Sequence, residues 1–126
     1  MLVFNDFLVL NLGKRIVKLS VADLLYVVCE DYICTLRMKD GRNYRVSTTL
    51  HSLYELLKQE GFDYAKREIL VNMHHVMELQ RVSQQKWRAV MCDGTVFDIA
   101  ARRQRAFKVY FYGNTLARKN NTLKGK

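Results

Sequence analysis

Proline is absent from the 126 residues of this chain, and neither an internal repeat nor a linker interrupts it. A chain of this length is close to the commonest size of a single domain, and two domains would be cramped. Hydrophobic residues make up 49% of the sequence and charged residues 26%, the ordinary balance of a globular protein. We therefore expect one domain with a real core and disorder only at its end.

Cysteine is scarce and lacks the spacing of a metal site. Cys29, Cys34 and Cys92 are an odd set without a close metal-binding pair, and each lies in an apolar run. We expect buried, reduced thiols, because disulfides are rare in a reducing cytosol. The N-terminus also lacks the features of a secretory signal, and no run approaches the ~20 apolar residues of a membrane-spanning helix. These absences predict a soluble cytoplasmic chain without a membrane partner.

Signs of an active site or a cofactor are lacking as well. His74 and His75 would point to opposite faces of a strand, and no acidic residue or cysteine lies at ligand spacing beside them. No glycine-rich loop follows a strand and opens a helix, which excludes the usual cradle for nucleotide phosphates. Cys34 with a histidine could imitate a nucleophile and its base, but a cysteine inside an apolar strand is usually inert. We expect no enzyme, no metal and no cofactor.

Acidic residues are missing from the last part of the chain. The net charge is +9, and residues 99–126 hold eight basic residues and no acid: Arg102, Arg103, Arg105, Lys108, Arg118, Lys119, Lys124 and Lys126. Such a basic field attracts polyanions, first nucleic acid and then an anionic membrane or an acidic protein. The alternative is a solvated basic face and tail that bind nothing specific.

The elements that the pattern predicts are mostly strands, so the expected fold class is mainly β. Asp40-Gly41 and Asp93-Gly94 each provide the positive backbone angles of a tight hairpin. One helical turn is expected at Ser20 to Asp23, where both side chains can bind free backbone N–H groups. The expected strands are residues 7–12, 15–19, 24–29, 32–38, 42–46, 76–82, 86–91 and 95–99.

One amphipathic helix is expected at about residues 49–59, with Leu53 and Leu56 in the core. Hydroxyl side chains precede it, leucines recur at helical spacing, and Gly61 suits its end. Residues 100–111 are predicted to form a short final helix, although residues 108–111 would also serve as a strand. We expect a domain of residues 1–113 and a basic, disordered tail of residues 114–126.

Residues 62–77 carry the most informative pattern. Aromatic residues before the triplet Lys66-Arg67-Glu68 and apolar residues after it can be buried on both sides, so the triplet would stand out from a fixed base. Arginine can bind guanine O6 and N7 with two hydrogen bonds. We therefore expect Lys66 and Arg67 to contact bases or phosphates.

The order of these motifs resembles the LytTR domain, a bacterial DNA-binding module. Its members carry an aromatic residue, two spacers, a basic pair near His-Arg-Ser, apolar residues and then Val-Asn. In this chain the triplet Lys66-Arg67-Glu68 replaces His-Arg-Ser, and Asn72 closes the motif as a turn residue. The remaining matches, within residues 7–111, are Leu24 to Val27 with Asp31-Tyr32, the Asp40-Gly41 turn, the helix from Leu50 to Leu57, and Arg102-Arg103.

The resemblance implies an elongated arrangement of stacked antiparallel sheets, whose loops read successive major-groove segments of duplex DNA. In the family the residue at Arg67 belongs to a DNA-reading loop, and Arg102 and Arg103 take the place of further basic contacts. Glu68 could accept a hydrogen bond from cytosine N4 or merely pair with Arg67. The phosphates would be held by Lys66, Arg105 and Lys108.

These inferences predict a sequence-specific transcriptional regulator in the bacterial cytoplasm. It would bind repeated half-sites, as a homodimer or behind a receiver domain. A third contact loop of the family falls at residues 31–33, where this chain has no basic residue, so that contact is not expected. A basic side chain at Arg102 opposes the positive end of a helix dipole unless a phosphate neutralises it. The rival interpretation is a protein-interaction β module that docks an acidic partner.

Overall fold

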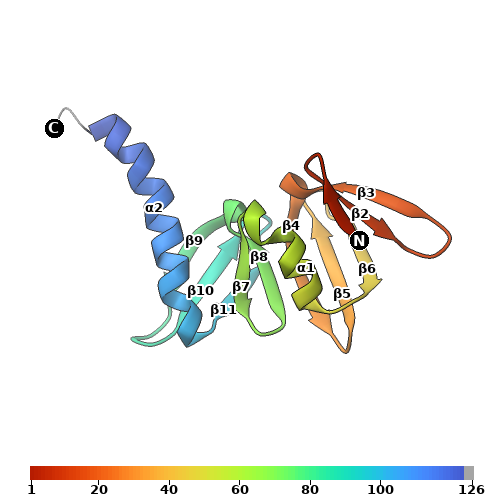
Figure 1. Cartoon of the computed structure of the whole chain (residues 1–126). Helices are drawn as coiled ribbons and strands as arrows, with labels where there is room; N and C mark the ends of the chain where they lie inside the picture. The colour runs from red at the N-terminus through yellow and green to blue at the C-terminus, as the bar shows by residue number, and fades with distance from the viewer. Residues whose placement is uncertain (124–126) are drawn as a thin grey trace.

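Three antiparallel sheets follow one another along the molecule (Figure 1). The structure is a computed structural model that describes the backbone of residues 1–123 and the side chains of residues 1–113. We refer to the N-terminal, central and C-terminal sheets. The central sheet lies between the other two, so the fold is mainly β and built of stacked sheets, as predicted.

The N-terminal sheet contains, in spatial order, β1 (Leu2–Phe4), β2 (Phe7–Asn11) and β3 (Ile16–Ser20). The β2–β3 hairpin agrees with the prediction, and the 3-10 turn η1 (Val21–Asp23) follows it. Strand β1 was not predicted, because three residues are too few to show an alternation. It forms because Asn5 and Asp6 both adopt positive φ, the conformation of a two-residue hairpin turn.

The central sheet has the order β6-β5-β4-β8-β7. Residues 62–77 were predicted to hold a charged loop between apolar anchors, and the structure shows that these anchors are two strands of a hairpin. This hairpin places β8 next to β4 and β7 at the edge of the sheet. The strands are β4 (Leu24–Glu30), β5 (Ile33–Met38), β6 (Asn43–Ser47), β7 (Phe62–Lys66) and β8 (Ile69–Asn72).

The C-terminal sheet has the order β11-β10-β9, with β9 (Val76–Arg81), β10 (Trp87–Met91) and β11 (Val96–Ile99) close to their predicted bounds. His74 and His75 do not lie in a strand, however. They end the 3-10 turn η3 (Met73–His75), because the buried Asn72 side chain accepts a hydrogen bond from the His74 N–H at 3.0 Å. Asn72 is therefore a turn residue, as predicted.

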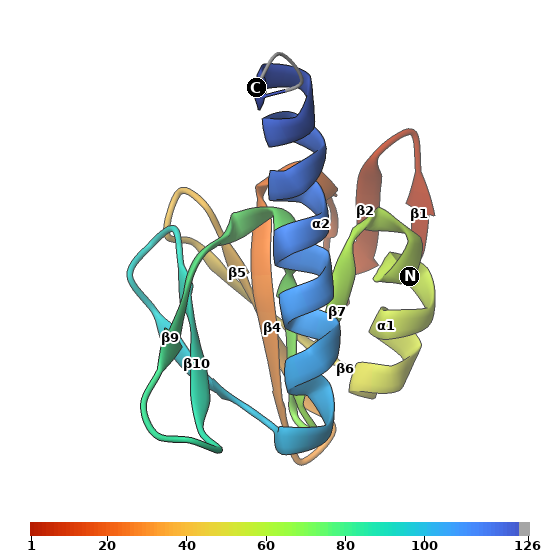
Figure 2. The ribbon, with the colours of Figure 1, turned by 90° about the vertical axis from the view of Figure 1, so that its left-hand side faces the viewer.

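Two α-helices cover the sheets. Helix α1 (Leu50–Leu57) begins after Thr49, whose hydroxyl accepts a hydrogen bond from the Ser52 N–H at 3.1 Å. A 3-10 turn, η2 (Lys58–Glu60), extends it to Gly61, which has a φ of 90°. Helix α2 (Gln104–Leu123) follows the turn η4 (Ala101–Arg103) and crosses in front of the central strands in Figure 2. Among the described residues, no helix is both long enough and apolar enough to span a membrane.

Helix α2 is longer than the sequence predicted. The helix was expected to end at Phe111, with disorder from residue 114, yet the backbone is helical as far as Leu123. No proline occurs in this stretch and Gly113 is its one glycine, so few residues oppose the helix. The last three residues of the predicted tail, 124–126, lie outside the described residues.

Two hydrophobic clusters lie on opposite faces of the central sheet. Successive residues of a strand point to opposite faces. Val27 and Leu70, which pair across β4 and β8, therefore enter the cluster beneath the N-terminal sheet and α1. Tyr26 and Val71 enter the other cluster, beneath the C-terminal sheet and α2, where Phe107 is fully buried. The central sheet is thus buried on both faces, as predicted for residues 24–29.

The cysteines are free, but they are not all buried as predicted. Cys34 is buried, Cys29 is half-buried and Cys92 is exposed. Cys92 directly follows β10 in the tight turn that leads to β11, where the chain leaves the packed layers. An apolar sequence neighbourhood therefore did not determine burial at this position.

The side chain of Leu53 in α1 is fully buried, whereas that of Leu56, also predicted as core, is half-buried at the margin of the same cluster. We expect Leu53→Ala to lower the free energy of unfolding by about 2 to 5 kcal/mol, because it leaves a cavity. Leu56→Ala should cost less. Urea denaturation measures both values, and equal losses would contradict this packing.

Candidate nucleic-acid interface

Four connections lie along one edge of the molecule, the lower edge in Figure 1. They are the β4–β5 turn, the β7–β8 turn, the β9–β10 loop and the connection from β11 to α2, and Figure 2 places them at the same end. We call this the loop edge. Both arginine motifs that the sequence analysis singled out, at residue 67 and at residues 102–103, belong to it.

Arg67 and Glu68 form the tip of the β7–β8 hairpin. Buried Ala65 and Ile69 flank the tip, and the Glu68 carbonyl accepts a hydrogen bond from the Cys29 N–H of β4 at 2.9 Å. Within the described part of the chain, the exposed Arg67 side chain makes no hydrogen bond or ion pair. Glu68 pairs with Lys66, 3.7 Å from Oε1 to Nζ, and not with Arg67. Arg67 therefore stands unpaired on a fixed base.

A β-bulge in β7 joins the two arginine motifs. The register of β7 against β8 shifts between Tyr64 and Lys66, which leaves Ala65 without a partner in β8. The Ala65 carbonyl instead accepts a hydrogen bond from the N–H of Ala100, just after β11, at 2.8 Å. The connection that carries Arg102 is thereby held beside β7.

Arg103 strengthens this attachment. Its guanidinium pairs with Asp63 and donates from Nε to the carbonyl of Tyr64 at 3.3 Å. It also lies 5.8 Å from the centroid of the Tyr64 ring. Arg102, by contrast, is exposed and has no hydrogen bond or ion pair within the described residues. The two adjacent arginines thus differ in role: Arg103 positions the connection, and Arg102 is available to a ligand.

A shallow hollow on the loop edge is lined by a tyrosine and three arginines. Its volume is about 350 Å³, and its lining residues are Tyr64, Arg67, Arg102 and Arg103. One of the three positive charges is balanced by Asp63, so two unpaired guanidinium groups remain. Guanidinium groups bind phosphate oxygens and the edge of guanine through paired N–H donors. The hollow is therefore suited to an anionic ligand with such acceptors.

A second basic area lies beside the hollow, on the first turns of α2. The Lys108 ammonium is 4.3 Å from the centroid of the Trp87 ring, and Arg105 is exposed. The Gln104 amide donates to the carbonyl of Gln85 in the β9–β10 loop at 2.9 Å. This contact fastens the start of α2 to the C-terminal sheet, so the position of the basic turns is defined.

Two neighbouring cations are neutralised within the fold. Arg88 donates to the carboxylate of Asp98 at 3.0 Å, and Lys86 pairs with it at 3.7 Å. These contacts, together with the field of Lys66, hold the pKa of Asp98 below its ordinary value. Lys86 and Arg88 are therefore less available to a ligand than the two unpaired arginines of the hollow.

The structure divides the seven residues selected from the sequence into three groups. Arg67, Arg102 and Arg103 share the hollow, Lys66 and Glu68 pair with each other in the β7–β8 hairpin, and Arg105 and Lys108 lie on α2. Sequence reasoning missed the partners that hold these residues. Tyr64 is one of the two aromatic residues that precede the triplet and were predicted to anchor it. No local sequence pattern links Asp63 to Arg103 or Trp87 to Lys108.

The β4–β5 turn contributes no cation to the loop edge, in agreement with the sequence. Asp31 and Tyr32 have φ values of 50° and 64°, as in a two-residue hairpin turn, and Tyr32 is 75% exposed. Among the side chains that the structure describes, those of residues 1–113, no three His, Cys, Asp or Glu come together in a group that could hold a metal ion.

The fold and the loop edge define a class of protein: a mainly β domain that presents unpaired arginines from its turns. A model of the LytTr DNA-binding domain family matches residues 14–111, and the chain belongs to that family. The fold is similar to that of the LytTr DNA-binding domain of a Bacillus cereus protein described as a methyl-accepting/DNA response regulator. The TM-score is 0.67 at 14% identity, over 86% of this chain and 94% of that chain. No curated protein matches the sequence.

Arg103→Ala should destabilise the domain, because it removes the ion pair and the hydrogen bond that attach the β11–α2 connection to β7. The Arg103 and Asp63 side chains are 29% and 30% exposed, so we expect a loss of about 1 to 2 kcal/mol in the free energy of unfolding. Arg102→Ala should change it by less than about 0.5 kcal/mol. Chemical denaturation of both variants tests the division of roles, and equal effects would refute it.

Proposed function

We infer that this domain recognises specific sequences in duplex DNA as the DNA-binding part of a bacterial transcription regulator. The observation that carries this proposal is the convergence of Arg67 and Arg102, from turns far apart in the sequence, on one positively charged hollow. Membership of the LytTr DNA-binding domain family supports DNA as the polyanion. The net charge of +9 supports a strong attraction to the phosphate backbone.

Base reading is assigned to the two unpaired arginines. The major groove of B-DNA is about 12 Å wide, which admits a two-stranded hairpin. The β7–β8 tip would carry Arg67 into the groove, and the β11–α2 connection would bring Arg102 to a nearby base pair of the same groove, because both side chains line one hollow. Each guanidinium can then donate to guanine O6 and N7. Glu68 could accept a hydrogen bond from cytosine N4 if it leaves Lys66.

Phosphate binding is assigned to the cations that flank the hollow, Lys66, Arg105 and Lys108. These contacts would fix the register of the domain on the duplex without carrying sequence information. Residues 1–113 would form the recognising domain, and residues 114–126 would add attraction without selectivity. Such a regulator would work in the bacterial cytoplasm on repeated half-sites, as two copies or behind a receiver domain.

A site selected from random duplexes provides the test of base reading. On that site, Arg67→Ala should cost about 1 to 3 kcal/mol of binding free energy and relax the preference at one or two base pairs, because a bidentate contact is lost. Arg102→Ala should do the same at a different position. Arg15→Ala removes an equal charge from the β2–β3 turn and serves as the control. If both loop-edge variants weakened random DNA as much as the selected site, the arginines would be phosphate clamps.

The salt dependence of binding separates phosphate contacts from base contacts. Lys108→Ala should weaken selected and random duplexes alike and reduce the slope of log affinity against log salt by about one unit, because one fewer phosphate is neutralised. Lys58→Ala in the turn η2 is the matched control and should leave the slope unchanged. Binding titrations at several KCl concentrations measure both slopes. An unchanged slope for Lys108→Ala would remove Lys108 from the interface.

A further inference from the structure

One edge of the N-terminal sheet carries unpaired backbone groups. The sheet order β1-β2-β3 leaves β3 without a neighbouring strand on its outer side. In an antiparallel pair, every second residue of a strand turns its N–H and C=O groups toward the neighbouring strand. The Val21 N–H donates to the Asp6 carbonyl at 3.0 Å, which shows that the odd-numbered residues of β3 are the ones bonded to β2. Backbone groups therefore point toward β2 at Val17 and Leu19, and toward the open side at Ile16, Lys18 and Ser20. We call this the β3 edge.

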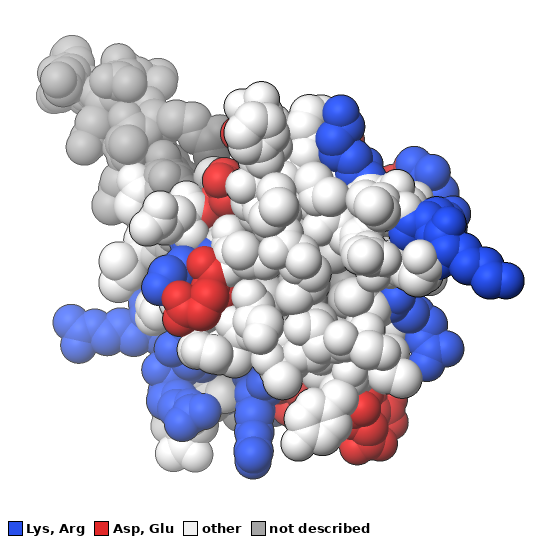
Figure 3. Space-filling view, turned by 45° about the vertical axis from the view of Figure 1, so that its right-hand side comes forward, with Lys and Arg blue, Asp and Glu red and all other residues white. Residues whose placement is uncertain are grey.

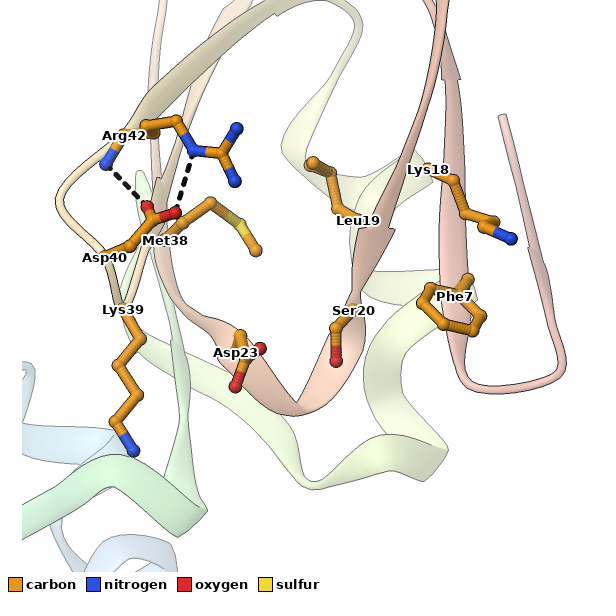
Figure 4. A pocket seen from close by; sticks show the side chains of 9 residues that line it. All are labelled: Phe7, Lys18, Leu19, Ser20, Asp23, Met38, Lys39, Asp40 and Arg42. Carbon is orange, nitrogen blue, oxygen red and sulfur yellow. Dashed lines mark hydrogen bonds and ion pairs between the residues drawn. The ribbon is translucent and has the colours of Figure 1, made fainter.

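The β3 edge faces a cleft of about 440 Å³. The cleft lies between β3 and the β5–β6 turn, and Figure 4 shows Leu19 and Met38 on its two sides, with Phe7 beyond β3. The apolar part of the cleft is thus formed by three side chains from different strands. Unpaired backbone groups beside such a cleft are what an added β-strand requires.

The cleft and its surroundings carry an excess of positive charge. Lys18, Lys39 and Arg42 line the cleft, together with two aspartates. The Asp40 carboxylate accepts hydrogen bonds from the Arg42 N–H at 3.0 Å and from its Nε at 2.8 Å, which hold the pKa of Asp40 below its ordinary value. One acid, Asp23, thus remains against two lysines. Figure 3, with the right-hand side of Figure 1 brought forward, shows a broad uncharged area bordered by Lys and Arg side chains and by fewer Asp and Glu side chains.

The β3 edge is not shielded in the usual way. Edge strands are commonly protected by a lysine that crosses the open side. The Lys18 ammonium instead lies 4.6 Å from the centroid of the Phe7 ring of β2, on the face of the sheet. The nearby Ile16 side chain is 70% exposed, a large fraction for an isoleucine in a strand. Both features leave the edge accessible and give it an apolar contact.

We propose that the β3 edge is a docking strand for an extended acidic segment of a partner protein, which adds to the N-terminal sheet as a fourth strand. Its backbone would pair with the outward groups of Ile16, Lys18 and Ser20. Acidic side chains on one face of the added strand would approach Lys18, and apolar side chains on its other face would enter the cleft between Leu19 and Met38. Strand β5 runs from Ile33 near the loop edge to Met38 at the cleft, a distance of about 17 Å. Partner and DNA can therefore be bound together.

The probe is a fluorescent peptide in which Glu alternates with Val, titrated with the complete chain. We expect saturable binding that weakens with salt, together with slowed amide hydrogen exchange at Ile16, Lys18 and Ser20. The same peptide with every backbone nitrogen methylated keeps its charge but lacks pairing N–H groups on both of its edges. It should bind at least about tenfold more weakly, because several backbone hydrogen bonds are lost. Equal binding of the two peptides would overturn the proposal.

Variants of the chain locate the site. Ile16→Pro removes an outward N–H without removing a bond to β2, so it should weaken the peptide about tenfold while thermal unfolding and DNA affinity stay unchanged. Lys18→Gln should weaken it severalfold at low salt, and Lys58→Gln, an equal charge change in the turn η2, should not. If Lys58→Gln had the same effect, or if the chain dimerised through this edge and lost the dimer in Ile16→Pro, the acidic partner would be the wrong occupant.

Discussion

The backbone hydrogen bond from Ala100 to Ala65 is the contact on which the loop edge depends. It exists because a bulge releases the Ala65 carbonyl from β8, and it holds the start of the β11–α2 connection against β7. Two unpaired arginines that line one hollow repel each other, so the turns that carry them would move apart if nothing held them together. The bond and the Arg103–Asp63 ion pair resist that separation. These two contacts organise the site before a ligand binds, and an anion in the hollow would relieve the remaining repulsion.

Burial of the central sheet on both faces makes this arrangement rigid. Alternate residues of β4 and β8 enter two separate clusters, and the turn that carries Arg67 projects from a hairpin whose strands belong to both. The Glu68 carbonyl is also bonded to Cys29 of β4. A movement of this tip would therefore disturb packing in two cores. A base-reading side chain needs such a base, because bidentate hydrogen bonds tolerate little displacement.

Charge alone does not distinguish the functional cations in this basic domain. Arg88 and Lys86 are held by Asp98, Arg103 by Asp63 and Arg42 by Asp40, whereas Arg67 and Arg102 have no ion-pair partner among the described side chains of residues 1–113. Acidic residues thus divide the cations into positioning groups and free groups. The β3 edge lies at the far end of β5 from the loop edge, so two surfaces of different chemistry share one scaffold.

The sequence by itself determined the mainly β class, the hairpins with Asp-Gly turns, helix α1 and the apolar anchors around Arg67, because these depend on alternation, turn chemistry and capping between near neighbours. It also selected Arg67 and Arg102. Only the tertiary structure decided that Arg103 is a positioning residue, that Glu68 pairs with Lys66, that Cys92 is exposed and that α2 reaches Leu123. The role of Arg103, the partner of Glu68 and the exposure of Cys92 depend on packing or on which of several competing contacts forms. The length of α2 depends on weak helix propensities summed over many residues, which a single motif does not reveal.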